Sequence, residues 1–425
     1  MSTGLPKRFK NIGMMSIGFE KNVQYYKFCL YGFLKNLRFF DAFFILFLLE
    51  KELSYTEIGT LYAVREILTN IFEVPSGIIA DRYGRKTALT ASFIAYIISF
   101  VLFFVATGFV WFLFAFVLFG LADAFRSGTH KAMIMDYLKL NKWETQKINY
   151  YGHTRACSQK GSAVSSLAAG LIVFYAGNYG NIFLFSIVPY MINFLLIMSY
   201  PADLNLSVGH KKRLGIGEML KSFYVVVKRP KVWRIINSSA VFTAYQKAVK
   251  DYIQLLMLGV AVMIPVLNHY ETKKKTGLII GLIYFVVYLL TSRASQLASK
   301  IAAVNKNKVA YSTLLVGFTG GILSGIFQHY ELWIFALLAF VLIYIIENIR
   351  KPILTGFLAD QVPNEILTSV ISVQSLYRTI LTSLIALLFG WAADVYGIGI
   401  SFILVTGILL IGVAVLNHLI DKPTD

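Results

Sequence analysis

The sequence predicts an all-α integral membrane protein in which twelve transmembrane helices form two pseudo-symmetric six-helix bundles. Hydrophobic residues make up 57% of the 425 positions and charged residues only 15%, with a mean hydropathy of +0.65. Soluble proteins average about 25% charged residues, and a single soluble core could not bury this much apolar surface. An ordinary cytosolic domain is therefore excluded. With 9 prolines and 2 cysteines, collagen-like chains and disulfide scaffolds are excluded as well.

The first observation behind this prediction is the length of the apolar stretches, because a helix needs about 20 apolar residues to cross the hydrocarbon core. Twelve such stretches lie near 30–50, 56–80, 87–107, 109–132, 152–177, 181–200, 233–265, 276–299, 308–328, 332–352, 369–392 and 396–418. The longest hydrophilic segment divides them six and six. We therefore expect an N-terminal bundle (1–200), a central cytoplasmic loop (201–231) and a C-terminal bundle (232–425).

The second observation is where the basic residues lie. With the N-terminus inside, most Lys and Arg of the connecting segments fall on the cytoplasmic side, which predicts a plasma-membrane protein with both termini in the cytoplasm. The run Lys273–Lys275 breaks this pattern. The net charge of +18 is explained by this topology, and no nucleic-acid-binding motif is present, so we expect no nucleic-acid partner. The basic N-terminus lacks the pattern of a cleaved signal peptide, and we expect a monomer in the bilayer.

The third observation is an internal repeat between the fourth and tenth stretches. A shift of 224 residues aligns Asp123 with Glu347, Arg126 with Arg350, Gly128 with Pro352, and Asp136 with Asp360. Gly and Pro both perturb helices, so the alignment predicts the same irregularity in each half. Parallel half-repeats of six spans are an architecture of secondary transporters, with the substrate site at the midplane between the halves.

The loop between the second and third stretches reads Gly77-Ile-Ile-Ala-Asp81-Arg82-Tyr-Gly84-Arg85-Lys86. This segment resembles the signature of the major facilitator superfamily, G-x-x-x-D-R-x-G-R-[KR], and the resemblance extends over the whole chain through the span count and the central loop. The counterpart in the second half is degenerate, with Ser295, Ser299 and Lys300 at the matching positions. The stretch 152–177 also lacks the Gly-Pro-x-x-Gly-Gly element of drug–proton antiporters, which counts against drug efflux.

The resemblance implies that this loop forms a conformational latch with a carboxylate at the end of the fourth span. The expected latch residues are Gly77, Asp81, Arg82, Gly84, Arg85 and Asp136. Glycines permit close packing and a tight turn, and an arginine can form a bidentate pair with a carboxylate. The alternative is a topogenic basic loop with a helix cap.

Charged residues within the stretches indicate a polar cavity, since a charge at the bilayer centre costs about 2.5–3.5 kcal/mol on insertion scales. They lie on the first, fourth, seventh and tenth stretches, and the resemblance implies that these four helices line the central cavity. The expected cavity residues are Arg38, Asp41, Asp123, Arg126, Lys247, Lys250, Asp251, Glu347 and Arg350. Lys35 either belongs to this set or extends to the interface, and Arg155 and Arg378 are interpreted as packing or gating partners.

These patterns favour a secondary active transporter of a small solute that works by alternating access and is coupled to protons. Asp41, Asp123, Asp251 and Glu347 are the candidate proton carriers. The four cavity helices carry six basic and four acidic residues, and pairing each acid with a base on its own helix leaves two cations, which favours a polar or anionic substrate. The alternatives are a multidrug-type efflux antiporter, a multi-pass membrane enzyme and a transport-dead receptor. Without a Walker motif or a metal-ligand pattern, we expect no cofactor.

Overall fold

The computed structural model describes residues 20–143, 146–205, 230–266, 269–302, 306–361 and 364–421, and this part of the chain is helical with no strand. The all-α class is therefore confirmed. Seven segments of it are long and apolar enough to cross a membrane, namely Arg85–Val105, Phe109–Leu140, Asn181–Met198, Thr272–Ala298, Trp333–Leu358, Val370–Tyr396 and Ile398–Val415. The count of twelve crossings stays a prediction. The basic N-terminus, most of the central loop, and the side chains of Ser299, Lys300 and Asp360 lie outside the described residues.

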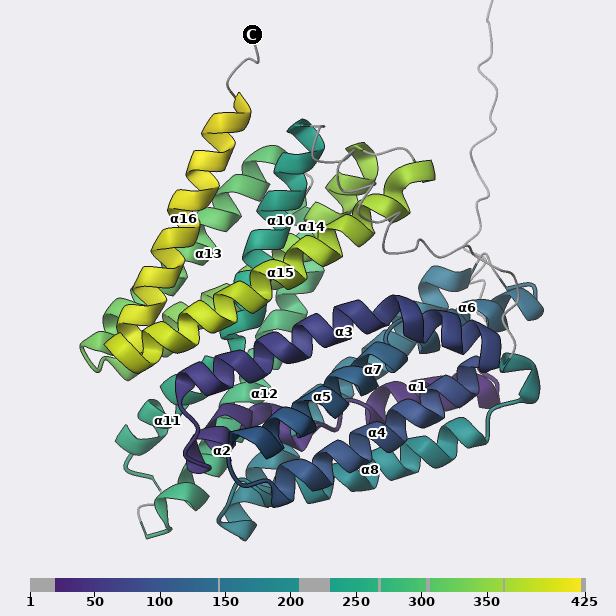
Figure 1. Cartoon of the computed structure of the whole chain (residues 1–425), viewed down its shortest axis with the longest axis horizontal. Helices are drawn as coiled ribbons and strands as arrows, with labels where there is room; N and C mark the ends of the chain where they lie inside the picture. Colours follow the sequence, from purple (N-terminus) through teal and green to yellow (C-terminus); the bar gives the residue numbers. More distant parts are fainter. Residues whose placement is uncertain are drawn as a thin grey trace, which may run out of the picture.

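The N-terminal half, up to residue 205, begins with two short helices followed by longer ones. Its helices are α1 (Val23–Leu34), α2 (Phe44–Glu50), α3 (Tyr55–Tyr83), α4 (Arg85–Val105), α5 (Phe109–Arg126), α6 (Thr129–Leu140), α7 (Lys147–Ala176) and α8 (Asn181–Met198). Those of the C-terminal half, from residue 230, are α10 (Pro230–Val249), α11 (Ile253–Met263), α12 (Thr272–Ala302), α13 (Lys306–His329), α14 (Trp333–Gln361), α15 (Asn364–Tyr396) and α16 (Ile398–Asp421). Figure 1 shows the two groups as separate bodies.

Three of the predicted stretches are broken, so the expectation of one continuous helix over 30–50, 109–132 and 233–265 is wrong. The first stretch is interrupted between α1 and α2, where Arg38 and Asp41 lie, and the seventh at a short 3-10 turn, Lys250–Tyr252. The fourth breaks at Gly128, whose φ of +73° is incompatible with a continuing α-helix. Polar residues that compete for backbone geometry thus coincide with breaks in two of the three stretches.

The predicted equivalence of Gly128 and Pro352 is not borne out as a helix break. α14 continues through Pro352 from Trp333 to Gln361. In contrast, Gly84, with a φ of +102°, ends α3 and allows the tight connection to α4 that the sequence predicted. α3 itself begins with a capping box, because the Ser54 hydroxyl accepts from the Glu57 amide while the Glu57 carboxylate accepts from the Ser54 amide.

The two halves meet mainly along α3 with α15 and α7 with α12. Glycines allow these contacts, since a Cβ at Gly59 would collide with the carbonyl oxygen of Ala386, and one at Gly281 with that of Ser166. We call this end of the molecule, around Tyr55, Tyr179, Thr276 and Asp394, the closed end. In Figure 1 the halves touch at the left, where α3 begins and α15 ends, and their helices run apart toward the opposite side.

Candidate functional site

The closed end is held by a carboxylate of one half that caps a helix of the other. Asp394, at the end of α15, accepts hydrogen bonds from the backbone N–H groups of Tyr55 at 2.9 Å and Thr56 at 2.7 Å, and from the Thr56 hydroxyl at 2.5 Å. These N–H groups open α3 and have no partner within their own helix. A carboxylate there is favoured by both hydrogen bonding and the helix dipole. The sequence analysis missed Asp394, because nothing local marks a cap supplied across halves.

The short helix α2 is held at both ends by side chains of the C-terminal half. The fully buried side chain of Gln254 accepts from the N–H of Ile45 at 2.9 Å and donates to the carbonyl of Asp41 at 3.0 Å. At the other end of α2, Lys273 forms an ion pair with Glu50 at 2.6 Å. This contact gives Lys273 a structural role and accounts for part of the basic run that broke the charge pattern.

A buried ionic network surrounds Asp123 at mid-depth in the N-terminal half. The carboxylate, in a residue only 7% exposed, pairs with Arg65 at 2.8 Å, Arg126 at 2.9 Å and Arg38 at 3.3 Å. It also accepts a hydrogen bond from the Tyr96 hydroxyl. The predicted residues Arg38, Asp123 and Arg126 thus meet at one point. Arg65, which the sequence analysis did not select, completes the network from α3.

The pairing expected within each helix holds for Asp123 with Arg126 and for Asp251 with Lys250, which lie 3.3 Å apart. It fails for Asp41, because the pairing of Arg38 is with Asp123. Within the described part of the chain, the Asp41 carboxylate makes neither a hydrogen bond nor an ion pair. Lys247 instead pairs across the halves with Glu66 at 2.5 Å.

The expected pair of Glu347 and Arg350 is also not formed. Glu347 is 6% exposed and accepts a hydrogen bond from the Thr243 hydroxyl at 2.9 Å, and no described residue forms an ion pair with it. Arg350 is 2% exposed and donates to Thr313 at 2.8 Å and Ser238 at 3.0 Å. Arg350 therefore lies within the C-terminal half and not on a cavity surface, since polar groups of neighbouring helices satisfy its guanidinium.

The predicted latch residues are gathered where α3, α4 and α6 meet. Arg85 pairs with Asp136 and, at 3.4 Å, with Asp81. Gly77 is buried within α3 and Gly84 forms the turn described above. Arg82 is exposed and lies over the ring of Tyr83, 5.4 Å from its centroid, so the geometry separates it from the ion pairs.

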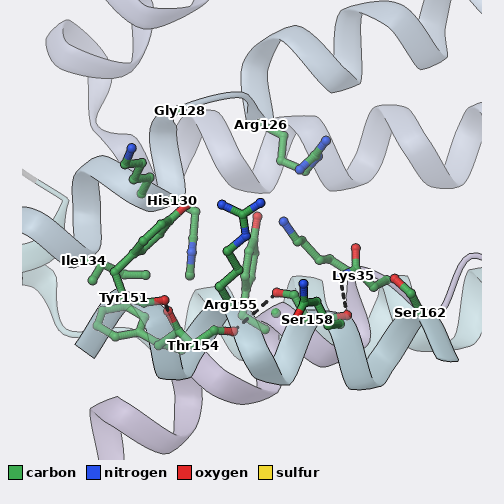
Figure 2. Close-up of a pocket in the computed structure, with 16 residues that line it drawn as sticks. Lys35, Arg126, Gly128, His130, Ile134, Tyr151, Thr154, Arg155, Ser158 and Ser162 are labelled. Carbon is green, nitrogen blue, oxygen red and sulfur yellow. Dashed lines mark hydrogen bonds between the residues drawn. The ribbon is translucent and has the colours of Figure 1, made fainter. Parts of the chain in front are cut away.

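A pocket of about 460 Å³ lies among α1, α6 and α7, away from the closed end. Four basic side chains line it, those of Lys35, Arg126, Lys131 and Arg155 (Figure 2). Figure 2 shows the charged ends of Lys35, Arg126 and Arg155 directed into one space. None of its sixteen lining residues, all in the described part of the chain, is acidic. We call this the basic pocket. Arg155 belongs to it, although its sequence context indicated only a packing or gating partner.

Comparison with known proteins adds three findings. The sequence model of the Major Facilitator Superfamily matches residues 29–386. The chain is 25% identical over 394 residues to the uncharacterised MFS-type transporter YxaM of Bacillus subtilis (strain 168), covering 91% of this chain and 92% of that one. It is also 29% identical over 122 residues, 28% of each chain, to a hexuronate transporter of the same organism.

Solved structures share the arrangement of helices. The nucleoside transporter NupG superposes with a TM-score of 0.75 at 11% identity, covering 94% of this chain and 100% of that one. A bacterial homologue of the human lysosomal transporter Spinster gives a TM-score of 0.67 at 13% identity, covering 95% and 97%. At such identities the likeness concerns the fold.

Proposed function

Because the chain belongs to the Major Facilitator Superfamily, we propose that it is a secondary active transporter that moves a small polar or anionic solute by alternating access. Twelve crossings and two pseudo-symmetric bundles, with boundaries near 200 and 232, fit the helix order, since described helix falls in each of the twelve predicted stretches. The observation that carries the proposal is the one-sided contact between halves. Side-chain bonds between described residues of the two halves lie at the closed end or at mid-depth.

In this proposal the closed end faces outward and the structure is inward-open. The predicted topology places the start of α3 outside and the latch inside. Transport then requires the bonds of Asp394, Gln254 and Lys273 to the N-terminal half to break while the latch end closes. The structure thus gives the outward gate as named bonds, each between groups of opposite halves.

The charge balance of the basic pocket favours an anionic substrate. Four basic residues and no acid line it, and a bound anion would relieve their mutual repulsion. The partial match to a hexuronate transporter is consistent with this preference, because a hexuronate carries a carboxylate. The competing multidrug-type efflux function would require an exposed acid for a lipophilic cation, and Asp41 is the described candidate, with Asp251 paired to Lys250.

Among the four candidate proton carriers, Glu347 is favoured. Asp123 is surrounded by three guanidiniums and Asp251 is paired, so both are stabilised in the ionised form. Glu347 is buried with only a hydroxyl as its described partner. Burial of a carboxylate without a cation is costly unless it takes up a proton. Reversible protonation of Glu347 is therefore our proposed coupling step.

Counterflow in proteoliposomes would test the function directly. Purified full-length protein would be loaded with unlabelled organic anions, neutral nucleosides or lipophilic cations, and uptake of the labelled compound would be followed. We expect exchange of at least one organic anion. Exchange confined to lipophilic cations, and abolished by Asp41→Asn or Asp251→Asn, would favour multidrug efflux. Absence of exchange for every class would contradict transport.

Asp394→Ala is expected to shift the protein toward the outward-open state. The substitution removes the acceptor of two α3 amides and one hydroxyl, and loss of an N-cap costs about 0.5–2 kcal/mol, which changes a two-state ratio by roughly two- to thirtyfold. Labelling of cysteines engineered at each end would measure this ratio, after replacement of the two free cysteines.

The matched control for this gate is Glu57→Ala, which breaks a cap of the same helix formed within its own half. It should reduce stability slightly and leave the ratio of states unchanged. A shift of equal size in both variants would show that fraying of α3, and not the bond between halves, governs the gate.

Asp81→Asn is expected to change the ratio of outward- to inward-open states more than it changes the amount of folded protein. Arg85 retains Asp136 as a partner in this variant, so the fold is preserved while the latch loses one charge. The same labelling assay applies, with Arg82→Gln as the control in the same loop. An equal response to both substitutions would indicate a general effect of loop charge and would contradict the latch.

A further inference from the structure

The basic pocket holds more positive charge than its protein partners neutralise. Lys35 and Arg155 form no hydrogen bond through their charged groups, and no ion pair, with any described residue. Arg126 uses Nε for Tyr96 and Nη2 for Asp123, which leaves Nη1 without a described partner. The acid behind Arg126 is already shared with Arg38 and Arg65. A single carboxylate thus serves three guanidiniums, and the pocket keeps a surplus of several charges.

Two neutral groups of the wall also suit an anion. α6 begins at the pocket, and its cap residue Gly128 supplies no side-chain bond, so the first amides of that helix point their positive end toward this region. Tyr31 lines the pocket and is 1% exposed, and its hydroxyl has no hydrogen-bond partner within the described part of the chain. A buried hydroxyl without a partner is costly, and a bound anion would accept its hydrogen bond.

We propose that the basic pocket binds a doubly charged anionic group of a small organic solute, either a phosphate monoester or a pair of carboxylates. This inference deepens the proposed function by naming the substrate class, and it rests on that function only for the statement that the bound solute is transported. Two negative charges match the surplus better than one, because three separate basic groups, Lys35, Arg126 and Arg155, converge on one space. A volume of about 460 Å³ lies in the range of small-molecule sites.

The test compares matched ligands that differ by charge. Thermal unfolding of the purified full-length protein would be followed with glucose 6-phosphate against glucose, and with succinate against its monoamide and diamide, at constant ionic strength and about pH 8, where the phosphate is dianionic. The variants are Arg155→Gln and Lys35→Gln. Lys139→Gln is the control, since Lys139 is exposed on α6 and does not line the pocket.

At least one dianion should bind about tenfold more tightly than its matched ligand of lower charge. In Arg155→Gln and Lys35→Gln this preference should fall toward unity, whereas Lys139→Gln should keep it. The two ligand series decide between a phosphate monoester and a dicarboxylate.

Equal binding of the lower-charge partner, no dianion bound at about 10 mM, or the same loss in Lys139→Gln would overturn the proposal. Binding that behaves as expected without counterflow of the same compound would uphold the pocket and contradict the transport function, so the two failures are distinguishable.

Discussion

Asp123→Asn is expected to be the most destabilising single substitution among the predicted site residues. The carboxylate is buried and neutralises part of the charge of three guanidiniums, those of Arg38, Arg65 and Arg126. Removing one partner of a buried ionic network costs about 3–5 kcal/mol, because the remaining charges stay buried without compensation. Thermal denaturation and size-exclusion profiles of the purified protein would show a lower melting temperature and less monodisperse material.

A second substitution can separate charge imbalance from loss of shape. Asp123→Asn combined with Arg65→Gln removes one carboxylate and one guanidinium, so it should recover part of the lost stability. Asp251→Asn is the control, because its partner Lys250 has a side chain that is 40% exposed and can be hydrated. If Asp123→Asn were no more destabilising than Asp251→Asn, the Asp123 network would not be the main polar support of the N-terminal half.

Glu347→Gln is expected to abolish proton-driven accumulation while leaving exchange intact. The amide has the shape of the acid and can still accept from Thr243, but it cannot carry a proton. A gradient of one pH unit supplies about 1.4 kcal/mol per proton, which supports roughly tenfold accumulation. For a solute identified by counterflow, the accumulation ratio should therefore fall from about ten to about one in the variant.

The comparison variant for this coupling step is Asp41→Asn, since Asp41 is the other candidate without an ion pair to a described residue. It should retain accumulation driven by the pH gradient. Loss of accumulation in Asp41→Asn with full coupling in Glu347→Gln would assign the proton to Asp41 and contradict our proposal. Loss of counterflow in Glu347→Gln would indicate a role in binding the solute.

Composition and local pattern were sufficient to predict the fold class, the family and the positions of most helices. A membrane helix must satisfy its backbone internally and present about 20 apolar residues to lipid, so its signal is written in a continuous stretch of sequence. The latch motif and the charged positions on the first, fourth and seventh stretches could be identified in the same way, because each is a local exception to an apolar pattern.

Partners could not be predicted in this way, because pairing depends on how helices from distant parts of the chain approach each other. Spacing along one helix suggested Asp41 with Arg38 and Glu347 with Arg350, whereas the packing of α1, α3 and α5 gave Arg38 and Arg65 to Asp123 and left Glu347 with a hydroxyl. No local pattern distinguishes Arg155 in the basic pocket from a residue that faces another helix.

The sequence by itself determined that this chain spans a membrane, carries charges within its spans and has the latch motif of its family, since these properties depend on residue type and short-range order. Only the tertiary structure decided which end is closed and by which bonds. Asp394 and Gln254 cap α3 and α2 from the opposite half, and such a cap exists only when a side chain and a helix N-terminus hundreds of residues apart are brought within about 3 Å.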